Sequence, residues 1–126
     1  RQGNNSCINW AARDRKLVRL LVRIGERSEA DLSLPRKSRS WYLHQLPHRA
    51  SVERHLDQLS LCRAFLDRYA ESVGEYQIRR LTNAMIEDAM AGQHSMGWQL
   101  ARRCGLQKGK IASLTASFIT SIGGLD

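Results

Sequence analysis

This sequence has no long hydrophobic run. A membrane-spanning helix needs about 20 consecutive apolar residues, and the most hydrophobic early stretch, LVRLLVRIG, is interrupted by Arg19 and Arg23. The same interruptions leave it without the apolar core of a signal peptide. We therefore expect no membrane span and no secretion signal, and a cytoplasmic, nucleoid-associated or nuclear location.

Cysteine is scarce, and its spacing fits neither a zinc ribbon nor a disulfide framework. The count is odd, the spacings are wide and no CxxC pair occurs, which favours reduced thiols. The three cysteines are Cys7, Cys62 and Cys104.

Signatures of catalysis are absent as well. The sequence shows no Gly-rich phosphate loop, no paired catalytic carboxylates and no nucleophile motif. His44 and His48 have the i, i+4 spacing of metal ligands, but Pro47 lies between them and no nearby cysteine or carboxylate completes a set. We expect no enzymatic activity, no metal and no cofactor.

Strand patterns are missing too, since no period-two alternation or Asn-Gly hairpin signal occurs. The 126 residues are enough for one core. We predict an all-α fold of five to six helices in a single domain. It comprises a basic N-terminal helix and loop (1–49), a central pair with one long helix (50–92) and a C-terminal helical pair (93–126).

What the sequence does have is basic charge at both ends. The net charge is +8. Residues 1–50 carry 11 Lys/Arg against 4 Asp/Glu, residues 51–92 carry 5 against 7, and residues 93–126 carry 4 against 1. This layout predicts a central scaffold whose flanks contact a polyanion.

The first helix is predicted to begin at Trp10, after an Asn9 cap, and to end at Gly25. One face is apolar. Another carries Arg15, Arg19 and Arg23 at i, i+4 and i+8, where like charges repel until a polyanion neutralises them.

Residues 26–49 hold both prolines and are predicted to be a loop with at most a short helical turn at 40–46. Aromatic residues Trp41 and Tyr42 follow a basic cluster. Two interpretations stay open: the loop clamps a phosphate backbone or stacks on a base, or the rings pack into the core. The basic cluster is Arg36, Lys37 and Arg39.

Residues 51–73 show a seven-residue apolar period over three heptads. They predict one helix of roughly 33 Å that ends at Gly74. It serves either as the spine of a bundle or as the seam of a homodimer. A further helix is predicted over 75–91.

The stretch WQLARRCGLQKGKIASL, residues 98–114, has a more specific spacing. Ala101 is followed by Gly105 four residues later and by Ile111 six residues after that. This pattern over residues 97–116 resembles the helix-turn-helix motif of bacterial and phage DNA-binding proteins, in which the glycine makes the turn with positive φ.

The resemblance implies a second helix that enters the major groove of duplex DNA. Polar side chains would then take separate roles. Lys108 and Lys110 would contact phosphates at the helix start, Gln107 and Ser113 would read bases, and Arg102 and Arg103 would contact the backbone. Gly109 departs from the pattern; a close approach of the backbone to DNA would explain it, and so would a helix that starts one turn later. A plain bend in a bundle is the alternative.

Together these features favour a DNA-binding protein, as a transcriptional regulator or a plasmid or phage DNA-maintenance factor. Phosphate contacts would also come from the arginine row of the first helix and from the basic loop. The alternatives are a helical protein–protein adaptor with basic ends and an RNA-binding helical bundle.

Overall fold

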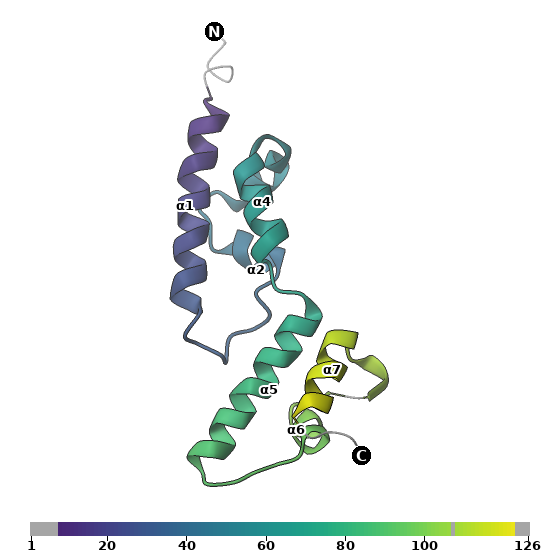
Figure 1. The fold of residues 1–126 in the computed structure, drawn as a ribbon. Helices are drawn as coiled ribbons and strands as arrows, with labels where there is room; N and C mark the ends of the chain where they lie inside the picture. Colours follow the sequence, from purple (N-terminus) through teal and green to yellow (C-terminus); the bar gives the residue numbers. More distant parts are fainter. Residues whose placement is uncertain (1–7, 107, 123–126) are drawn as a thin grey trace. The chain divides into compact units, whose positions relative to one another are not determined.

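A computed structural model describes residues 8–106 and 108–122 (Figure 1). These residues form seven α-helices and two short 3₁₀ helices, and no strand occurs among them, so the all-α prediction is confirmed. The α-helices outnumber the five or six expected. The elements are α1 (Trp10–Ser28), α2 (Arg39–His44), α3 (Arg49–Arg54), η2 (Leu56–Gln58), α4 (Ser60–Tyr69), α5 (Val73–Met90), α6 (Gly97–Arg103), η3 (Lys108–Lys110) and α7 (Ser113–Ser121).

The contacts divide the chain into two compact units. Unit 1 comprises the described residues up to 30 together with 37–70, and unit 2 comprises 31–36 and the described residues from 71 onward. Each unit buries its own apolar cluster. In unit 1 the cluster joins α1 to α2, α3 and α4, and in unit 2 it joins α5 to α6 and α7.

Helix α1 begins where the sequence predicts, because the Asn9 side chain accepts a hydrogen bond from the Ala12 amide at 3.0 Å. It does not end at Gly25, however, but continues to Ser28. Gly25 keeps a helical conformation and lies under the Tyr42 ring, whose Oη would be 3.5 Å from a Cβ at this position. A Cβ here would make ordinary van der Waals contact with the ring, so Gly25 neither ends the helix nor is required for this packing.

The predicted continuous helix over 51–73 is wrong. Its residues form α3, η2 and α4, and the chain leaves helical geometry at His55 and Leu59. The buried carboxylate of Asp14 in α1 accepts hydrogen bonds from the Leu61 and Cys62 amides, at 2.8 and 3.0 Å. It thereby caps α4, which has no side-chain cap of its own. Since no single helix spans 51–73, the proposed dimer seam loses its structural basis.

The structure distinguishes between the two interpretations of Trp41 and Tyr42, which were stacking on a base and packing into the core. Tyr42 is buried at 4% exposure, and Trp41 packs against the unit 1 core from α2. Their rings meet edge to face at 5.0 Å. Tyr42 therefore packs into the core and is not available to stack on a base.

Helix α5 matches the predicted helix over 75–91 and begins slightly earlier. Ser72 and Glu75 form a reciprocal capping box at its start, with hydrogen bonds of 2.8 and 3.1 Å. Gly74 lies inside the first turn, where a Cβ would come within 3.1 Å of the Ala112 Cβ. Its small size lets the segment before α7 pack closely against α5.

The buried guanidinium of Arg79 in α5 holds residues 31–36 within unit 2. It makes two parallel 2.8 Å hydrogen bonds to the Glu71 carboxylate, which also raises the pKa of Arg79. It donates three further bonds of 2.8 Å to the carbonyls of Leu32, Leu34 and Pro35. One side chain thus satisfies three carbonyls of a segment without regular structure.

Candidate nucleic-acid interface

The sequence-predicted basic residues lie in both units. In unit 1, Arg15, Arg19 and Arg23 are all exposed on α1. Among the described residues none of the three has an acidic side chain within ion-pair distance. They form a row along the helix at intervals of about 6 Å. We call this the α1 arginine row.

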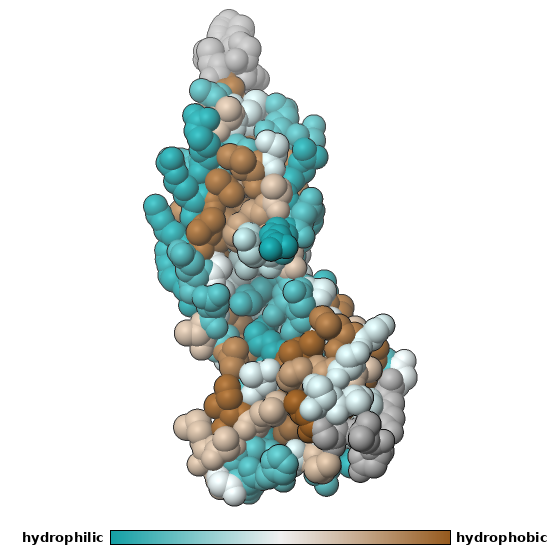
Figure 2. All heavy atoms as spheres, viewed as in Figure 1, coloured by the Kyte–Doolittle hydropathy of each residue, from teal (hydrophilic) through white to brown (hydrophobic). Residues whose placement is uncertain are grey.

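Figure 2 shows hydrophilic side chains along the outer edge of α1, on the side away from α4. An unpaired, exposed row of guanidinium groups fits a ligand with regularly spaced negative charge. The row is therefore the part of the predicted site whose geometry agrees best with its predicted role.

The basic cluster at 36–39 is not a free patch. Arg36 donates from Nε to the Glu71 carbonyl at 3.0 Å. Arg39 forms a 2.6 Å ion pair with Asp67 of α4, and the Lys37 ammonium lies 3.5 Å from the Ser28 hydroxyl. Each of these side chains already serves the packing of its own unit.

The C-terminal stretch agrees with the predicted motif at two positions. Ala101 is fully buried in α6, and Gly105 has a φ of +76°, the left-handed conformation that favours glycine. The second helix starts later than predicted. Lys108–Lys110 form the 3₁₀ turn η3, and α7 begins only at Ser113. Ile111 packs on the unit 2 core from outside any helix.

The predicted DNA-contacting residues of this stretch have different surroundings. Lys110 and Ser113 are exposed, and Arg102 is exposed at the end of α6. Gln107 lies outside the described residues, as does the side chain of Lys108. Because η3 lies between α6 and α7, residues 108–111 do not form the first turns of a reading helix.

Arg103 is held by the protein itself. Its Nη1 pairs with the buried Asp88 carboxylate at 2.8 Å, and Nη2 donates to the Ala84 carbonyl at 3.3 Å. The Ser95 hydroxyl and then the Arg103 guanidinium lower the pKa of the Asp88 carboxyl. The partner of Arg103 is therefore ionised at neutral pH.

The sequence analysis did not single out Arg80. Arg80 is half-buried, lies 5.8 Å from the centre of the Tyr76 ring, and lines a cavity of about 270 Å³ with Asn83 and Arg103. The sequence could not show that Arg79 has a structural role whereas Arg80 lines a cavity. The two roles depend on which side of α5 faces residues 31–36, and two adjacent arginines do not reveal that.

The described thiols show no activated nucleophile. Cys62 is fully buried, and burial together with the Asp14 carboxylate raises the pKa of its thiol to about 12. Burial also raises the pKa of Cys104. Both thiols stay protonated at neutral pH.

The described residues also bear on metal binding and on membrane insertion. No three His, Cys, Asp or Glu side chains in this part of the chain lie close enough together to hold a metal ion. None of its helices is both long and apolar enough to cross a membrane.

These observations define a strongly basic chain whose described residues form an all-α fold with two apolar cores and an exposed arginine row. Its sequence is similar to the transposon Tn7 transposition protein TnsD of Escherichia coli, with 37% identity over 117 residues. The match covers 93% of this chain and 23% of TnsD, so the chain spans about a quarter of the length of that relative. No family model matches the sequence, and no solved structure matches it.

Proposed function

We propose that this chain is a non-enzymatic, DNA-binding part of a transposition protein. Two findings support the proposal: the similarity to a transposition protein over 93% of the chain, and a net charge of +8. Transposition moves a segment of DNA, and a basic helical chain in such a protein has duplex DNA as its natural polyanion.

The observation that carries the proposal is the α1 arginine row. Three exposed arginines without acidic partners repel one another along one helix, and the phosphates of a duplex relieve that repulsion. We assign them to phosphate contacts, which supply affinity and orientation without reading sequence.

For unit 2 we propose that α6 and α7 act as a helix-turn-helix element with a long turn. The buried Ala101 and the positive φ of Gly105 support this. In this arrangement α7 is the helix that enters the groove, so base contacts move from Gln107 to exposed positions of α7 such as Ser113 and Ser117. Arg102 at the end of α6 and Lys110 in η3 then add phosphate contacts.

The test is fluorescence anisotropy of labelled duplex DNA, single-stranded DNA and structured RNA at several salt concentrations. We expect duplex DNA to bind most tightly. Replacing Arg15, Arg19 and Arg23 together by glutamine should weaken duplex binding and lower the slope of log affinity against log salt by about 2 to 3, since each phosphate contact contributes about 0.9.

A matched control removes the same charge elsewhere on unit 1. Arg54, Arg63 and Arg68 are exposed outside α1 and are replaced by glutamine together. The control should keep most of the slope. An equal loss in both triple variants would show that only net charge matters, and tighter binding of RNA than of duplex DNA would favour the RNA-binding alternative.

A further inference from the structure

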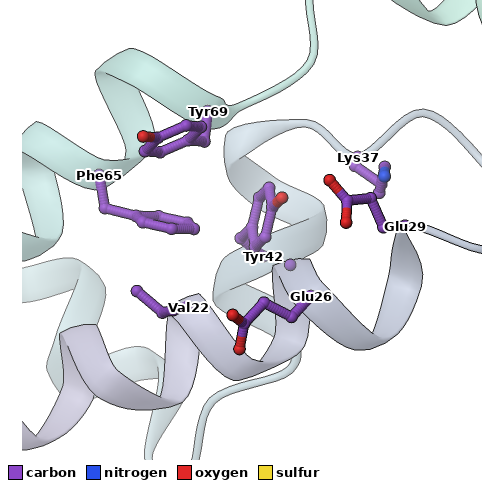
Figure 3. A pocket seen from close by; sticks show the side chains of 8 residues that line it. Val22, Glu26, Glu29, Lys37, Tyr42, Phe65 and Tyr69 are labelled. Atoms are coloured by element: carbon purple, nitrogen blue, oxygen red, sulfur yellow. The ribbon is translucent and has the colours of Figure 1, made fainter.

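Unit 1 contains a cavity lined by aromatic rings and carboxylates, in contrast to the positively charged α1 arginine row. The cavity has a volume of about 330 Å³ and lies between α1, α2 and α4. Figure 3 shows three aromatic rings around it, from Tyr42, Phe65 and Tyr69, with Val22, Glu26 and Glu29 along the α1 side. This volume is at the small end of the range for ligand pockets and suits one large side chain.

The aromatic wall is continuous. The Tyr42 and Phe65 rings meet edge to face with centroids 5.3 Å apart, and the Phe65 and Tyr69 centroids are 5.1 Å apart. Tyr69 remains 59% exposed although it belongs to this cluster. The faces of such rings carry the negative end of a quadrupole and attract a cation.

Carboxylates line the other side of the cavity. Glu26 and Glu29 are exposed at the end of α1, and no ion pair to either occurs among the described residues. Lys37 is the one cation among the lining residues, and its ammonium lies 3.5 Å from the Ser28 hydroxyl. The cavity thus carries two carboxylates against one ammonium in a chain whose net charge is +8.

Apolar surface continues from the cavity along the same seam. Val22 is 43% exposed, and Figure 2 shows hydrophobic surface where α1 meets α4. Gly25 contributes no side chain to the floor, where a Cβ would lie 3.5 Å from the Tyr42 Oη and 3.7 Å from the Phe65 Cζ. The site therefore offers contacts for an aliphatic stem next to aromatic faces and carboxylates.

We propose that this cavity binds an arginine side chain presented by a partner protein. The guanidinium is planar, stacks on aromatic rings and pairs with carboxylates, whereas a lysine ammonium does not stack. Charge complementarity selects the occupant, because two carboxylates attract a basic peptide and repel a nucleic acid phosphate. The cavity is thus a protein-docking site distinct from the α1 arginine row, and it does not depend on the proposed DNA binding.

The test uses the full 126-residue chain and a blocked Gly-Arg-Gly peptide, followed by NMR of the aromatic ring protons. We expect saturable shifts of the rings of Phe65 and Tyr69. A matched peptide with citrulline, the neutral analogue of arginine, should bind at least tenfold more weakly, and a Gly-Lys-Gly peptide should bind more weakly than the arginine peptide. Equal binding of the citrulline peptide would overturn the proposal, as would an absence of ring shifts.

Two variants locate the site. Glu26→Gln should weaken peptide binding about threefold to tenfold by removing one charge-assisted contact, and Tyr69→Leu should weaken it by removing an exposed ring. Asp57→Asn, an equal charge change on exposed η2, should leave it unchanged. Duplex DNA affinity should not fall in any of the three variants.

Unchanged peptide affinity in the folded Glu26→Gln and Tyr69→Leu proteins would place binding elsewhere and overturn the assignment, with circular dichroism reporting the fold. Ring shifts that depend on protein concentration without peptide would show that a second copy of the chain fills the cavity, which also overturns it.

Discussion

A single buried carboxylate, that of Asp14, ties two helices of unit 1 together. At 3% exposure it accepts hydrogen bonds from two amides at the start of α4, and the Cys62 thiol lies 3.7 Å from the Asp14 carbonyl. Negative charge at a helix N-terminus is stabilising, and buried amides without acceptors are costly. The sequence did not reveal this role, because the partners are 47 and 48 residues apart.

We predict that Asp14→Ala lowers the free energy of unfolding of unit 1 by about 1–3 kcal/mol, because the buried Cys62 amide and the partly buried Leu61 amide lose their acceptor. Asp14→Asn keeps one acceptor and should cost less. The measurement is urea denaturation followed by Trp10 and Trp41 fluorescence in a Trp98→Phe background. Asp57→Ala is the matched control, expected within about 0.5 kcal/mol of the parent. Equal stability of the two alanine variants would contradict the capping role.

Helices whose start is set by a local cap were predictable, and helices set by distant contacts were not. Asn9 caps α1 within three residues, so the sequence located its start. The Ser72 cap of α5 is equally local, but the apolar period placed Ser72 inside the preceding helix, so the sequence located α5 without its first residues. The apolar period over 51–73 identified buried positions such as Val52, Leu59 and Cys62. It could not show that the helix breaks before α4, because the carboxylate that caps α4 comes from α1.

Arg79 of α5 fixes the segment 31–36 within unit 2. Its side chain is 8% exposed and that of Glu71 is 10% exposed. Removal of one member of a buried ion pair leaves the other charge without compensation, and here it would also leave three carbonyls without a donor.

We predict that Arg79→Met lowers the free energy of unfolding of unit 2 by about 3–5 kcal/mol. Arg79→Lys should lower the free energy of unfolding less, because it keeps the positive charge. It should still destabilise unit 2, because one ammonium cannot reach the carboxylate and all three carbonyls at once. Denaturation followed by Trp98 fluorescence in a Trp10→Phe/Trp41→Phe background measures both. A double-mutant cycle with Glu71→Gln should show coupling, and strict additivity would contradict a direct pair.

The chain as a whole has two separate apolar clusters, one in each unit. Leu21 is fully buried in the unit 1 cluster and Leu81 in the unit 2 cluster. Because the units do not share these clusters, a cavity made in one is expected to weaken that unit first.

We predict that Leu21→Ala lowers the denaturation midpoint reported by Trp41 more than that reported by Trp98, and that Leu81→Ala does the reverse. Each substitution should cost about 2–5 kcal/mol in its own unit. Single-tryptophan versions of each variant give the two midpoints, with the single-tryptophan parents as controls. Coincident midpoints in both variants would show that the chain unfolds as one cooperative body.

The amino-acid sequence by itself determined the all-α class, the basic charge, the start of α1, the position of α5, the exposed arginine row and the turn at Gly105. Each of these follows from residue type, from helical periodicity or from neighbours a few residues away. Only the tertiary structure decided that α3 and α4 are separate, that Tyr42 is buried, and that Arg36, Arg39 and Arg103 have partners within the protein. These outcomes depend on contacts between residues far apart in sequence, whose desolvation and hydrogen bonding override local preference.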